Sequence, residues 1–314
     1  MNIRTRVTGA VLLCLIVNVS GFGQGDKLKE KSATAIPVDT ELTLGAATND
    51  QRGAISSAVF ITCPKNGVKG SGFLLSTGVI VTAAHVVCGC DAQELKGLTP
   101  LGVPVTFRAA ISDKSRDIAA LSPTNTLSGG LELGSDVTLT LGQRVETWGF
   151  PLIYNGPAPL LSVGYVAGYY EAAEKDACTG VVNATRKIKH IVVNGAFNPG
   201  NSGGALLGTD KRVTGVVIWQ EIAFSGQVKE AIDGFHHPRA VMGGTFSETL
   251  PDGTTRGVSD EEVLARVLEE FYNRVQVDIG EAVSVTELRD FLREHARELG
   301  LSADGSRRGE VIRH

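Results

Sequence analysis

The chain has 314 residues, of which 42% are hydrophobic, and it contains 38 glycines but only 11 prolines. This composition is too apolar for a disordered chain, and the length suits one large domain or two small ones. The formal net charge is −4, and because the sequence has no basic stripe, nucleic acid is not an expected partner.

The N-terminal segment, residues 1–24, predicts a secretory signal peptide. Arg4 and Arg6 precede the apolar run Ala10–Val17, and the small-residue sequence Gly21-Phe22-Gly23 follows it. This run is shorter than the about 20 apolar residues that a membrane-spanning helix needs. We therefore expect cleavage near residue 23 and export to the bacterial periplasm or the extracellular medium.

The middle of the chain predicts a β-rich domain over residues 54–240, preceded by a polar linker or arm over residues 25–53. Short apolar runs are separated by turn residues with almost no helical periodicity between them, a pattern typical of β-sandwiches and barrels. The expected strands are Ala58–Thr62, Gly72–Leu75, Val79–Ala83, Val103–Ala109, Ile118–Leu121, Val137–Thr140, Arg144–Phe150, Leu160–Ala167, Lys189–Val193, Ala205–Leu207 and Val213–Trp219.

The last part, residues 241–314, predicts a linker and a small helical appendage. Ser259 to Glu262 has the spacing of a capping box, and apolar residues follow at helical intervals as far as Val275. A second helix is expected from about Val285 to Leu299, with Gly300 as its C-terminal stop. The segment VDIGEAVS between the two helices is expected to be a loop.

Four cysteines follow the predicted signal peptide: Cys63, Cys88, Cys90 and Cys178. An even number of cysteines in an exported protein predicts disulfides. A bond between Cys88 and Cys90 would close a strained small ring, so Cys63 and Cys178 are expected to pair with these two, in one order or the other. A four-cysteine zinc site is the alternative, although the oxidising compartment favours disulfides and no metal is expected.

Three separated stretches offer a histidine, an aspartate and a serine. His85 ends the run VIVTAAH, Asp117 lies in SRDIAAL, and Ser202 lies at the centre of GNSGG. A serine hydroxyl is a weak nucleophile near neutral pH and needs an adjacent base, which in turn needs an orienting acid. Each residue alone could be structural, but the three together in an exported β-rich chain indicate nucleophilic catalysis.

The motifs TAAHVV, DIAAL and NPGNSGGALL resemble those of the chymotrypsin-like serine proteases, in particular the bacterial HtrA-type branch, over roughly residues 54–225. The resemblance implies two antiparallel six-stranded β-barrels, with His85 and Asp117 on the first and Ser202 on the second. It implies that His85 is the general base, Asp117 its orienting acid and Ser202 the nucleophile. The backbone N–H groups of Gly200 and Ser202 would form the oxyanion hole. A protein or peptide is the expected substrate, and no cofactor is implied.

The resemblance also implies a substrate pocket. Family spacing puts the pocket base at Ala196 and Phe197, facing Ile218, Trp219 and Gln220. No Asp or Glu occurs between Ile188 and Gly208, and a buried cation without a counter-charge is costly. The pocket is therefore expected to accept small or aliphatic side chains.

The family's common disulfide across the histidine hairpin implies that Cys63 is bonded to Cys88, and hence Cys90 to Cys178. In contrast to the HtrA branch, no PDZ domain is recognisable after the β core.

Two other functions are compatible with the sequence. GNSGG also fits the G-x-S-x-G elbow of α/β-hydrolases, where Asp210 or Asp233, with His236 or His237, would complete the triad. That elbow needs a helix after the serine, whereas the chain after Ser202 is typical of a strand. A catalytically silent binding module on a protease fold is the second alternative, and the presence of all three triad residues favours an enzyme.

Overall fold

A computed structural model describes residues 39–151, 157–195, 197–218, 246–249, 254–258, 264–266 and 279–302. The predicted signal peptide, Ala196, Trp219 and Gln220 lie outside the described residues. So does most of the first predicted C-terminal helix, of which residues 264–266 are described and helical. No helix within the described residues is long and apolar enough to cross a membrane.

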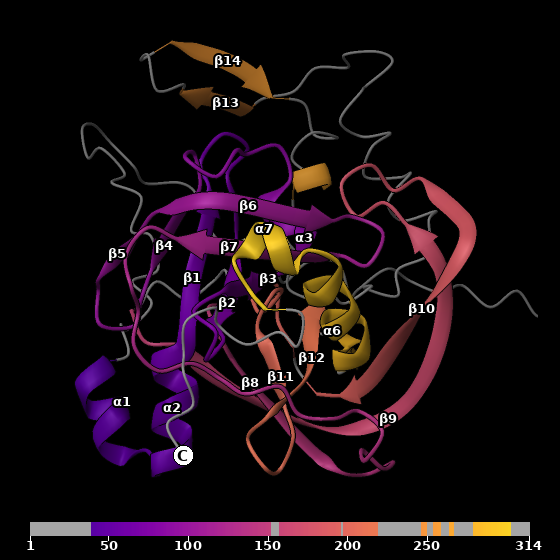
Figure 1. The fold of residues 1–314 in the computed structure, drawn as a ribbon. Helices are drawn as coiled ribbons and strands as arrows, with labels where there is room; N and C mark the ends of the chain where they lie inside the picture. The colour runs from indigo at the N-terminus through magenta and orange to yellow at the C-terminus, as the bar shows by residue number, and fades with distance from the viewer. Residues whose placement is uncertain are drawn as a thin grey trace, which may run out of the picture. The chain divides into compact units, whose positions relative to one another are not determined.

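The first part of the fold is a seven-stranded antiparallel sheet in the order β5-β4-β1-β2-β3-β7-β6 (Figure 1). Its strands are β1 (Ala58–Cys63), β2 (Val68–Leu74), β3 (Ile80–Thr82), β4 (Lys96–Leu98), β5 (Pro104–Val105), β6 (Phe107–Asp113) and β7 (Ile118–Pro123). Buried aliphatic side chains such as Ile61, Ile80 and Leu121 pack into one cluster. The short helix α3 (Ala84–Val87) follows β3 after one residue.

The second part is a closed antiparallel barrel in the order β10-β15-β12-β11-β8-β9. Its strands are β8 (Arg144–Gly149), β9 (Leu160–Lys175), β10 (Val182–Asn194), β11 (Ala205–Leu207), β12 (Val213–Ile218) and β15 (Ile279–Ser284). Val145, Ile191, Leu206 and Val217 are among the side chains that fill it. The expected all-β, chymotrypsin-like fold is confirmed, with the difference that strand pairing closes only the second unit into a six-stranded barrel.

Residues 279–301 of the C-terminal region are part of this fold. β15 pairs with both β10 and β12, so the segment expected to be a loop is a barrel strand. Helices α6 (Val285–Glu294) and α7 (Ala296–Leu299) follow it, and Gly300 ends α7 in the left-handed conformation at φ +73°. Leu288 and Phe291 of α6 lie in the largest buried cluster, which includes side chains from both units. The expected C-terminal helices therefore pack on the β core, and the barrel takes in a strand that lies beyond the expected domain boundary at residue 240.

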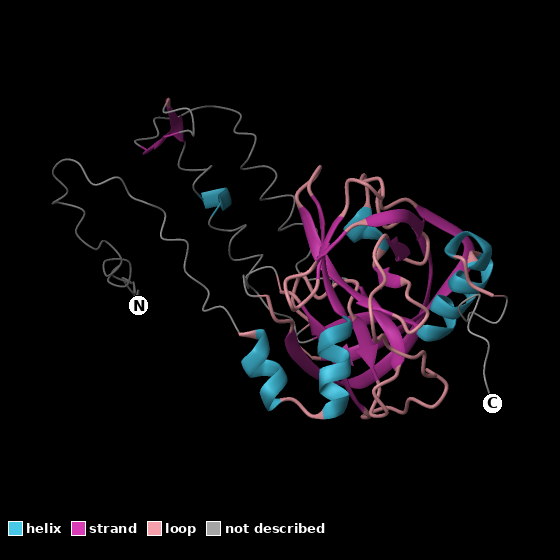
Figure 2. Cartoon of the chain, turned by 60° about the vertical axis from the view of Figure 1, so that its left-hand side comes forward, coloured by secondary structure: helices cyan, strands magenta, loops and turns pink. Residues whose placement is uncertain are grey.

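Two helices precede β1: α1 (Thr40–Ala46) and α2 (Asn49–Ser57) (Figure 2). Thr48 and Gln51 form a capping box at the start of α2. Ala54 and Ile55 of α2 are buried in the same cluster as Phe291. The expectation of a polar linker is therefore wrong for residues 40–53, because side-chain caps at Asp39 and Thr48 begin two helices and the second is held by the burial of Ala54 and Ile55.

One further expected strand, Val137–Thr140, is a turn. The Ser135 hydroxyl accepts the N–H of Val137, and the Leu139 N–H donates to the Asp136 carbonyl. Val137 is 81% exposed.

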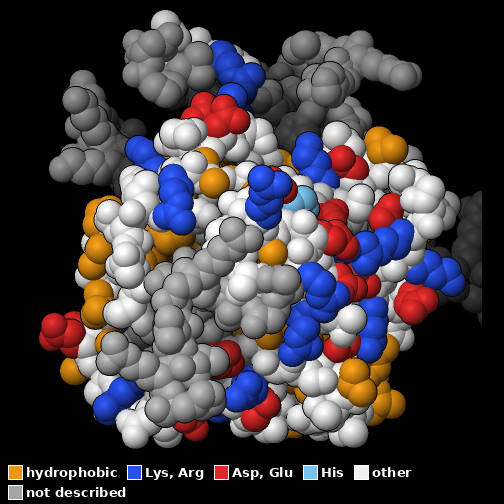
Figure 3. Space-filling model, viewed as in Figure 1, with side chains coloured by type: hydrophobic (Ala, Val, Ile, Leu, Met, Phe, Trp, Pro, Cys, Tyr) orange, Lys and Arg blue, Asp and Glu red, His pale blue; other side chains and the backbone are white. Residues whose placement is uncertain are grey.

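A separate hairpin is formed by β13 (Phe246–Thr249) and β14 (Thr255–Val258). On the face shown in Figure 3, positive and negative side chains lie side by side over α6 and β10.

Candidate active site

His85 and Asp117 are brought together by neighbouring strands. His85 lies on α3, directly after β3, and Asp117 lies directly before β7; these two strands are paired. Asp117 Oδ1 accepts the backbone N–H of His85 at 2.9 Å, and Oδ2 lies 2.8 Å from His85 Nδ1. Because Nδ1 is occupied by the carboxylate, Nε2 is the ring nitrogen left to exchange a proton with a hydroxyl.

Asp117 has a special backbone conformation. Its φ is +54°, in the left-handed region that L-residues other than Asn and Asp seldom adopt. The turn before it is held by Asp113, whose Oδ1 accepts the N–H groups of Ser115 and Arg116 at 3.0 and 3.1 Å. The sequence indicated the aspartate but not this conformation, which depends on contacts outside the motif.

Ser202 lies on the loop between β10 and β11 of the barrel, and this loop packs directly on the first sheet. The Ser71 N–H on β2 donates to the Ser202 carbonyl at 2.8 Å. Gly203 has φ +86°, and a Cβ there would lie 2.1 Å from the Ser71 carbonyl oxygen and 2.8 Å from the backbone nitrogen of Ala83. Only glycine permits this approach, which places Ser202 beside the β3–α3 junction that carries His85.

Two backbone N–H groups of the same loop are available to bind a substrate oxygen. The N–H groups of Asn201, Gly203 and Gly204 donate to carbonyls of the protein. The N–H groups of Gly200 and Ser202 make no hydrogen bond to other described residues. The Gly200 carbonyl is fixed by the Ser71 hydroxyl at 2.6 Å. Two neighbouring, unused N–H groups are what an oxyanion hole requires.

The predicted pocket residues that are described are Phe197 and Ile218. Phe197 is 2% exposed and packs in the barrel core, whereas Ile218 is partly buried at the end of β12. The Phe197 ring lies against Gly280 of β15, where a Cβ would lie 2.4 Å from it. Gly280 was missed in the sequence, where the only signal was a glycine within a short apolar strand.

Glu281 on β15 and His190 on the neighbouring strand β10 both contact Tyr170. Glu281 follows Gly280 and therefore faces the other side of β15, where it accepts a hydrogen bond from the Tyr170 hydroxyl at 2.8 Å. The His190 ring on β10 stacks on Tyr170 with centroids 4.7 Å apart. Burial lowers the pKa of His190, and the negative charge of Asp117 only partly opposes this effect. A neutral His190 does not supply the cation that an acid-specific pocket needs.

All four cysteines form disulfides, but the pairing differs from the expectation. Cys63 is bonded to Cys90, and Cys88 to Cys178. Cys88 and Cys90 flank Gly89, whose φ of +81° turns the chain between them, so the two sulfurs reach different partners. The expected Cys63–Cys88 and Cys90–Cys178 bonds are therefore wrong. The sulfurs offer no thiolates for zinc, and no cluster of three or more potential metal ligands occurs in the described part of the chain.

The second disulfide joins the two halves of the fold. Cys178 lies in the turn between β9 and β10 of the barrel, and Cys88 follows the helix that carries His85. The Ala177 N–H in the same turn donates to the Lys114 carbonyl at 2.9 Å, in the turn that leads to Asp117. The tip of the long hairpin thus contacts the loops of both His85 and Asp117.

The α/β-hydrolase alternative is wrong. Ser202 is followed by the strand β11 and not by a helix, and all pairs of named strands are antiparallel. Of its candidate triad partners, Asp233, His236 and His237 lie outside the described residues.

Residues 70–216 match the family model described as a trypsin-like peptidase domain. Protease Do-like 1 from chloroplasts of Arabidopsis thaliana is 31% identical over 193 residues, which are 59% of this chain and 40% of that protein. The serine protease Do-like HtrA of Lactobacillus helveticus is 28% identical over 231 residues, which are 63% of this chain and 52% of that protein. The chain thus spans about half or less of the length of these relatives.

A solved protease structure has a similar fold. The active form of the Rv3671c protease from M. tuberculosis aligns with 82% of this chain and 89% of its own, with a TM-score of 0.54 and 16% identity. Family model, relatives and fold agree on the same class. The chain therefore has a match to the trypsin-like peptidase domain over residues 70–216 and resembles the chymotrypsin-like serine proteases in sequence and fold.

Proposed function

We propose that this chain is an exported serine endopeptidase that uses Ser202, His85 and Asp117. The observation that carries the proposal is the double contact of the Asp117 carboxylate with His85, at Nδ1 and at the backbone N–H. Such an acid fixes the tautomer in which Nε2 accepts a proton. The adjacent Ser202 loop, with its two unused N–H groups, supplies the remaining parts of the site.

The proposed reaction follows from these groups. His85 Nε2 takes the proton of the Ser202 hydroxyl as its oxygen attacks the peptide carbonyl carbon. The N–H groups of Gly200 and Ser202 stabilise the negative oxygen of the tetrahedral intermediate. His85 then gives the proton to the leaving amine, and an acyl-enzyme remains on Ser202. Water, deprotonated by His85, then attacks the ester carbonyl carbon. His85 returns this proton to the Ser202 oxygen as the carboxylic acid is released, while Asp117 stays ionised throughout.

We propose cleavage after small or aliphatic residues. The Phe197 ring packs against Gly280 of β15 and occupies the space beside it, which favours a pocket of modest size. The nearest carboxylate on that strand, Glu281, faces the other side. Export is supported by the two disulfides, since these bonds persist in oxidising compartments.

Labelling with a fluorophosphonate, which reacts with activated serines, tests the activity. The mature protein is expected to be labelled, Ser202→Ala is expected not to be, and a peptide library should be cut mainly after Ala, Val or Leu. If the well-folded wild-type protein is neither labelled nor active on the library, the chain is instead a binding module. Efficient cleavage after Lys or Arg alone would contradict only the pocket.

A further inference from the structure

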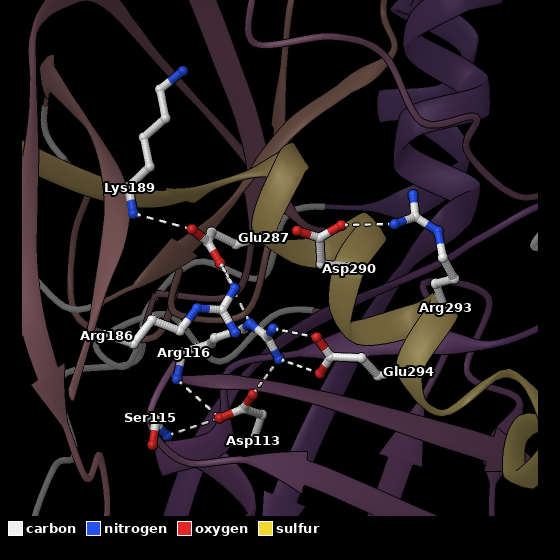
Figure 4. Close-up of polar contacts among 9 residues, drawn as sticks. All are labelled: Asp113, Ser115, Arg116, Arg186, Lys189, Glu287, Asp290, Arg293 and Glu294. Carbon is white, nitrogen blue, oxygen red and sulfur yellow. Dashed lines mark hydrogen bonds and ion pairs between the residues drawn. The ribbon is translucent and has the colours of Figure 1, made fainter. Parts of the chain in front are cut away.

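A buried ionic cluster joins the turn of Asp117 to helix α6. Arg116, the residue before Asp117, carries a full charge and is only 2% exposed. Its guanidinium contacts three carboxylates: Asp113 in its own turn, and Glu287 and Glu294 on α6 (Figure 4). The residue that precedes the proposed acid of the triad is thus held by a helix from the far end of the chain.

Every nitrogen of the guanidinium is used. Nη1 and Nη2 donate to the two oxygens of Glu294 at 2.8 and 2.6 Å, as a parallel pair. Nη1 also donates to Asp113 at 2.5 Å, and Nε donates to Glu287 at 3.3 Å. Burial alone would lower the pKa of Arg116, but the hydrogen bond to Glu294 and the charge of Asp113 outweigh it and raise that pKa. Because the guanidinium is planar and its N–H groups point in fixed directions, it sets the orientation of the bound carboxylates as well as their distance.

The α6 end of the cluster is itself fixed to the barrel. Glu287 also accepts hydrogen bonds from the Arg186 side chain at 2.8 Å and from the Lys189 backbone N–H at 3.3 Å, both on β10. The Thr286 hydroxyl donates to Asp136 at 2.7 Å, and Lys189 Nζ lies 2.7 Å from the same carboxylate. These contacts fix α6 on the barrel, so the carboxylates that bind Arg116 are held in place.

Stability is a weak explanation for the cluster, since replacing buried ion pairs by well-packed apolar side chains of similar volume often leaves a fold equally or more stable. The charged hydrogen bonds add one defined arrangement of the Asp113–Asp117 turn relative to α6. Asp117 needs that geometry, because its carboxylate must reach both the ring nitrogen Nδ1 and the backbone N–H of His85.

We propose that Arg116 is a positioning residue. Its ion pairs with Glu287 and Glu294 of α6 fix the backbone at Asp117. The fixed backbone then orients the Asp117 carboxylate toward His85. The inference rests on the proposed function, because the aim of the carboxylate affects a rate only where His85 acts as a base. Arg116 itself touches no reacting atom and acts through Asp117.

Two variants and one matched control test this role. Arg116→Lys keeps the charge and removes the planar set of donors. Glu294→Gln weakens the paired hydrogen bonds to Arg116 at a side chain that is half exposed. The control is Glu146→Gln, since Glu146 is as buried as Arg116 and pairs with Arg144 and Lys211 on the barrel. We expect kcat/KM to fall about 10- to 100-fold in Arg116→Lys, and less in Glu294→Gln.

In both variants the acid limb of the pH profile of kcat/KM should move to lower pH, because a misaligned carboxylate stabilises the imidazolium less. Glu146→Gln should melt at a lower temperature without moving that limb. If Arg116→Lys and Glu294→Gln only melt earlier, as the control does, the cluster is purely structural and the inference is wrong.

A second measurement does not depend on turnover. In a Ser202→Ala background, the downfield NMR signal of the proton on His85 Nδ1 reports its bond to Asp117. We expect Arg116→Lys to shift or broaden this signal and Glu146→Gln to leave it in place; an unchanged signal in Arg116→Lys contradicts the inference. A wild-type protein that fails to label overturns the proposed function, while this signal still tests the placement of Asp117.

Discussion

The Asp117 carboxylate binds His85 through both of its oxygens, one at the ring nitrogen Nδ1 and one at the backbone N–H. The first contact sets the tautomer of the ring, and the second sets the position of the helix turn that carries it. A carboxylate accepts both bonds, whereas an amide has one oxygen and a donor in place of the other.

Replacing Asp117 by Asn is therefore expected to break one of the two contacts or to force the wrong tautomer. We expect kcat to fall by about 10⁴-fold, the size of effect found when the acid of a Ser-His-Asp triad becomes an amide. Steady-state kinetics on a cleaved peptide measure it, with circular dichroism to show that the variant folds. A folded variant that loses less than about tenfold would rule out Asp117 as the orienting acid.

Gly203→Ala is expected to displace the Ser202 loop from the first sheet. The added Cβ would meet the Ser71 carbonyl oxygen, and the residue would keep an unfavourable positive φ. The conformation alone should cost about 1–3 kcal/mol, and labelling of Ser202 should be lost. Gly168→Ala on β9 is the matched control, since a Cβ there meets nothing within 4 Å. Equal unfolding free energies in denaturant for the two variants would contradict this packing.

The Cys88–Cys178 bond is expected to stabilise the fold and to order the hairpin tip. Replacing both cysteines by Ser should lower the unfolding free energy by about 2–5 kcal/mol and increase hydrogen exchange around Ala177. The pair Cys63→Ser and Cys90→Ser should affect the hairpin tip less, because that bond lies within the first sheet and its adjoining loop. Non-reducing peptide mapping checks the pairing directly, and a Cys63–Cys88 peptide would overturn it.

A further carboxylate in contact with α6, that of Asp136, predicts a pH dependence of stability. Burial of its fully covered side chain would raise its pKa, but the hydrogen bonds from Lys189 and Thr286 outweigh burial and lower it below the ordinary 3.8. A carboxyl whose pKa is lower in the folded state stabilises the fold above about pH 4, and this contribution disappears as the pH falls through the lowered pKa. Asp136→Asn should be less stable at neutral pH and should lose less stability on acidification. Urea unfolding between pH 2 and 7 tests this, and parallel curves for the two proteins would contradict it.

Local motifs in the sequence were sufficient to single out His85, Asp117 and Ser202. Each motif sits at the end of a strand or in a glycine-rich loop whose pattern spans only a few residues. The strand Ile279–Ser284 could not be predicted in this way, because its conformation is set by pairing with β10 and β12, which are distant in sequence. Local propensity is a weak guide to a strand of this kind.

The errors at Val137–Thr140 and at the cysteines have similar causes. Val137–Thr140 alternates like a strand, but hydrogen bonds at Ser135 and Asp136 turn the chain. Cys88 and Cys90 are too close in sequence for spacing to assign their partners, and the choice depends on the turn at Gly89. In both places a backbone conformation, which no residue pattern displays, decided the outcome.

The position of β15 in the chain has a consequence for maturation. His85, Asp117 and Ser202 all precede it, so a chain that emerges from its N-terminus presents all three residues of the proposed triad before the barrel can close. Until residues 279–284 arrive, β10 and β12 each keep an open edge, and such edges pair readily with strands of other chains. The helix that reaches Arg116 arrives later still. A nascent or truncated chain therefore holds the chemical groups of a protease without the framework that aligns them.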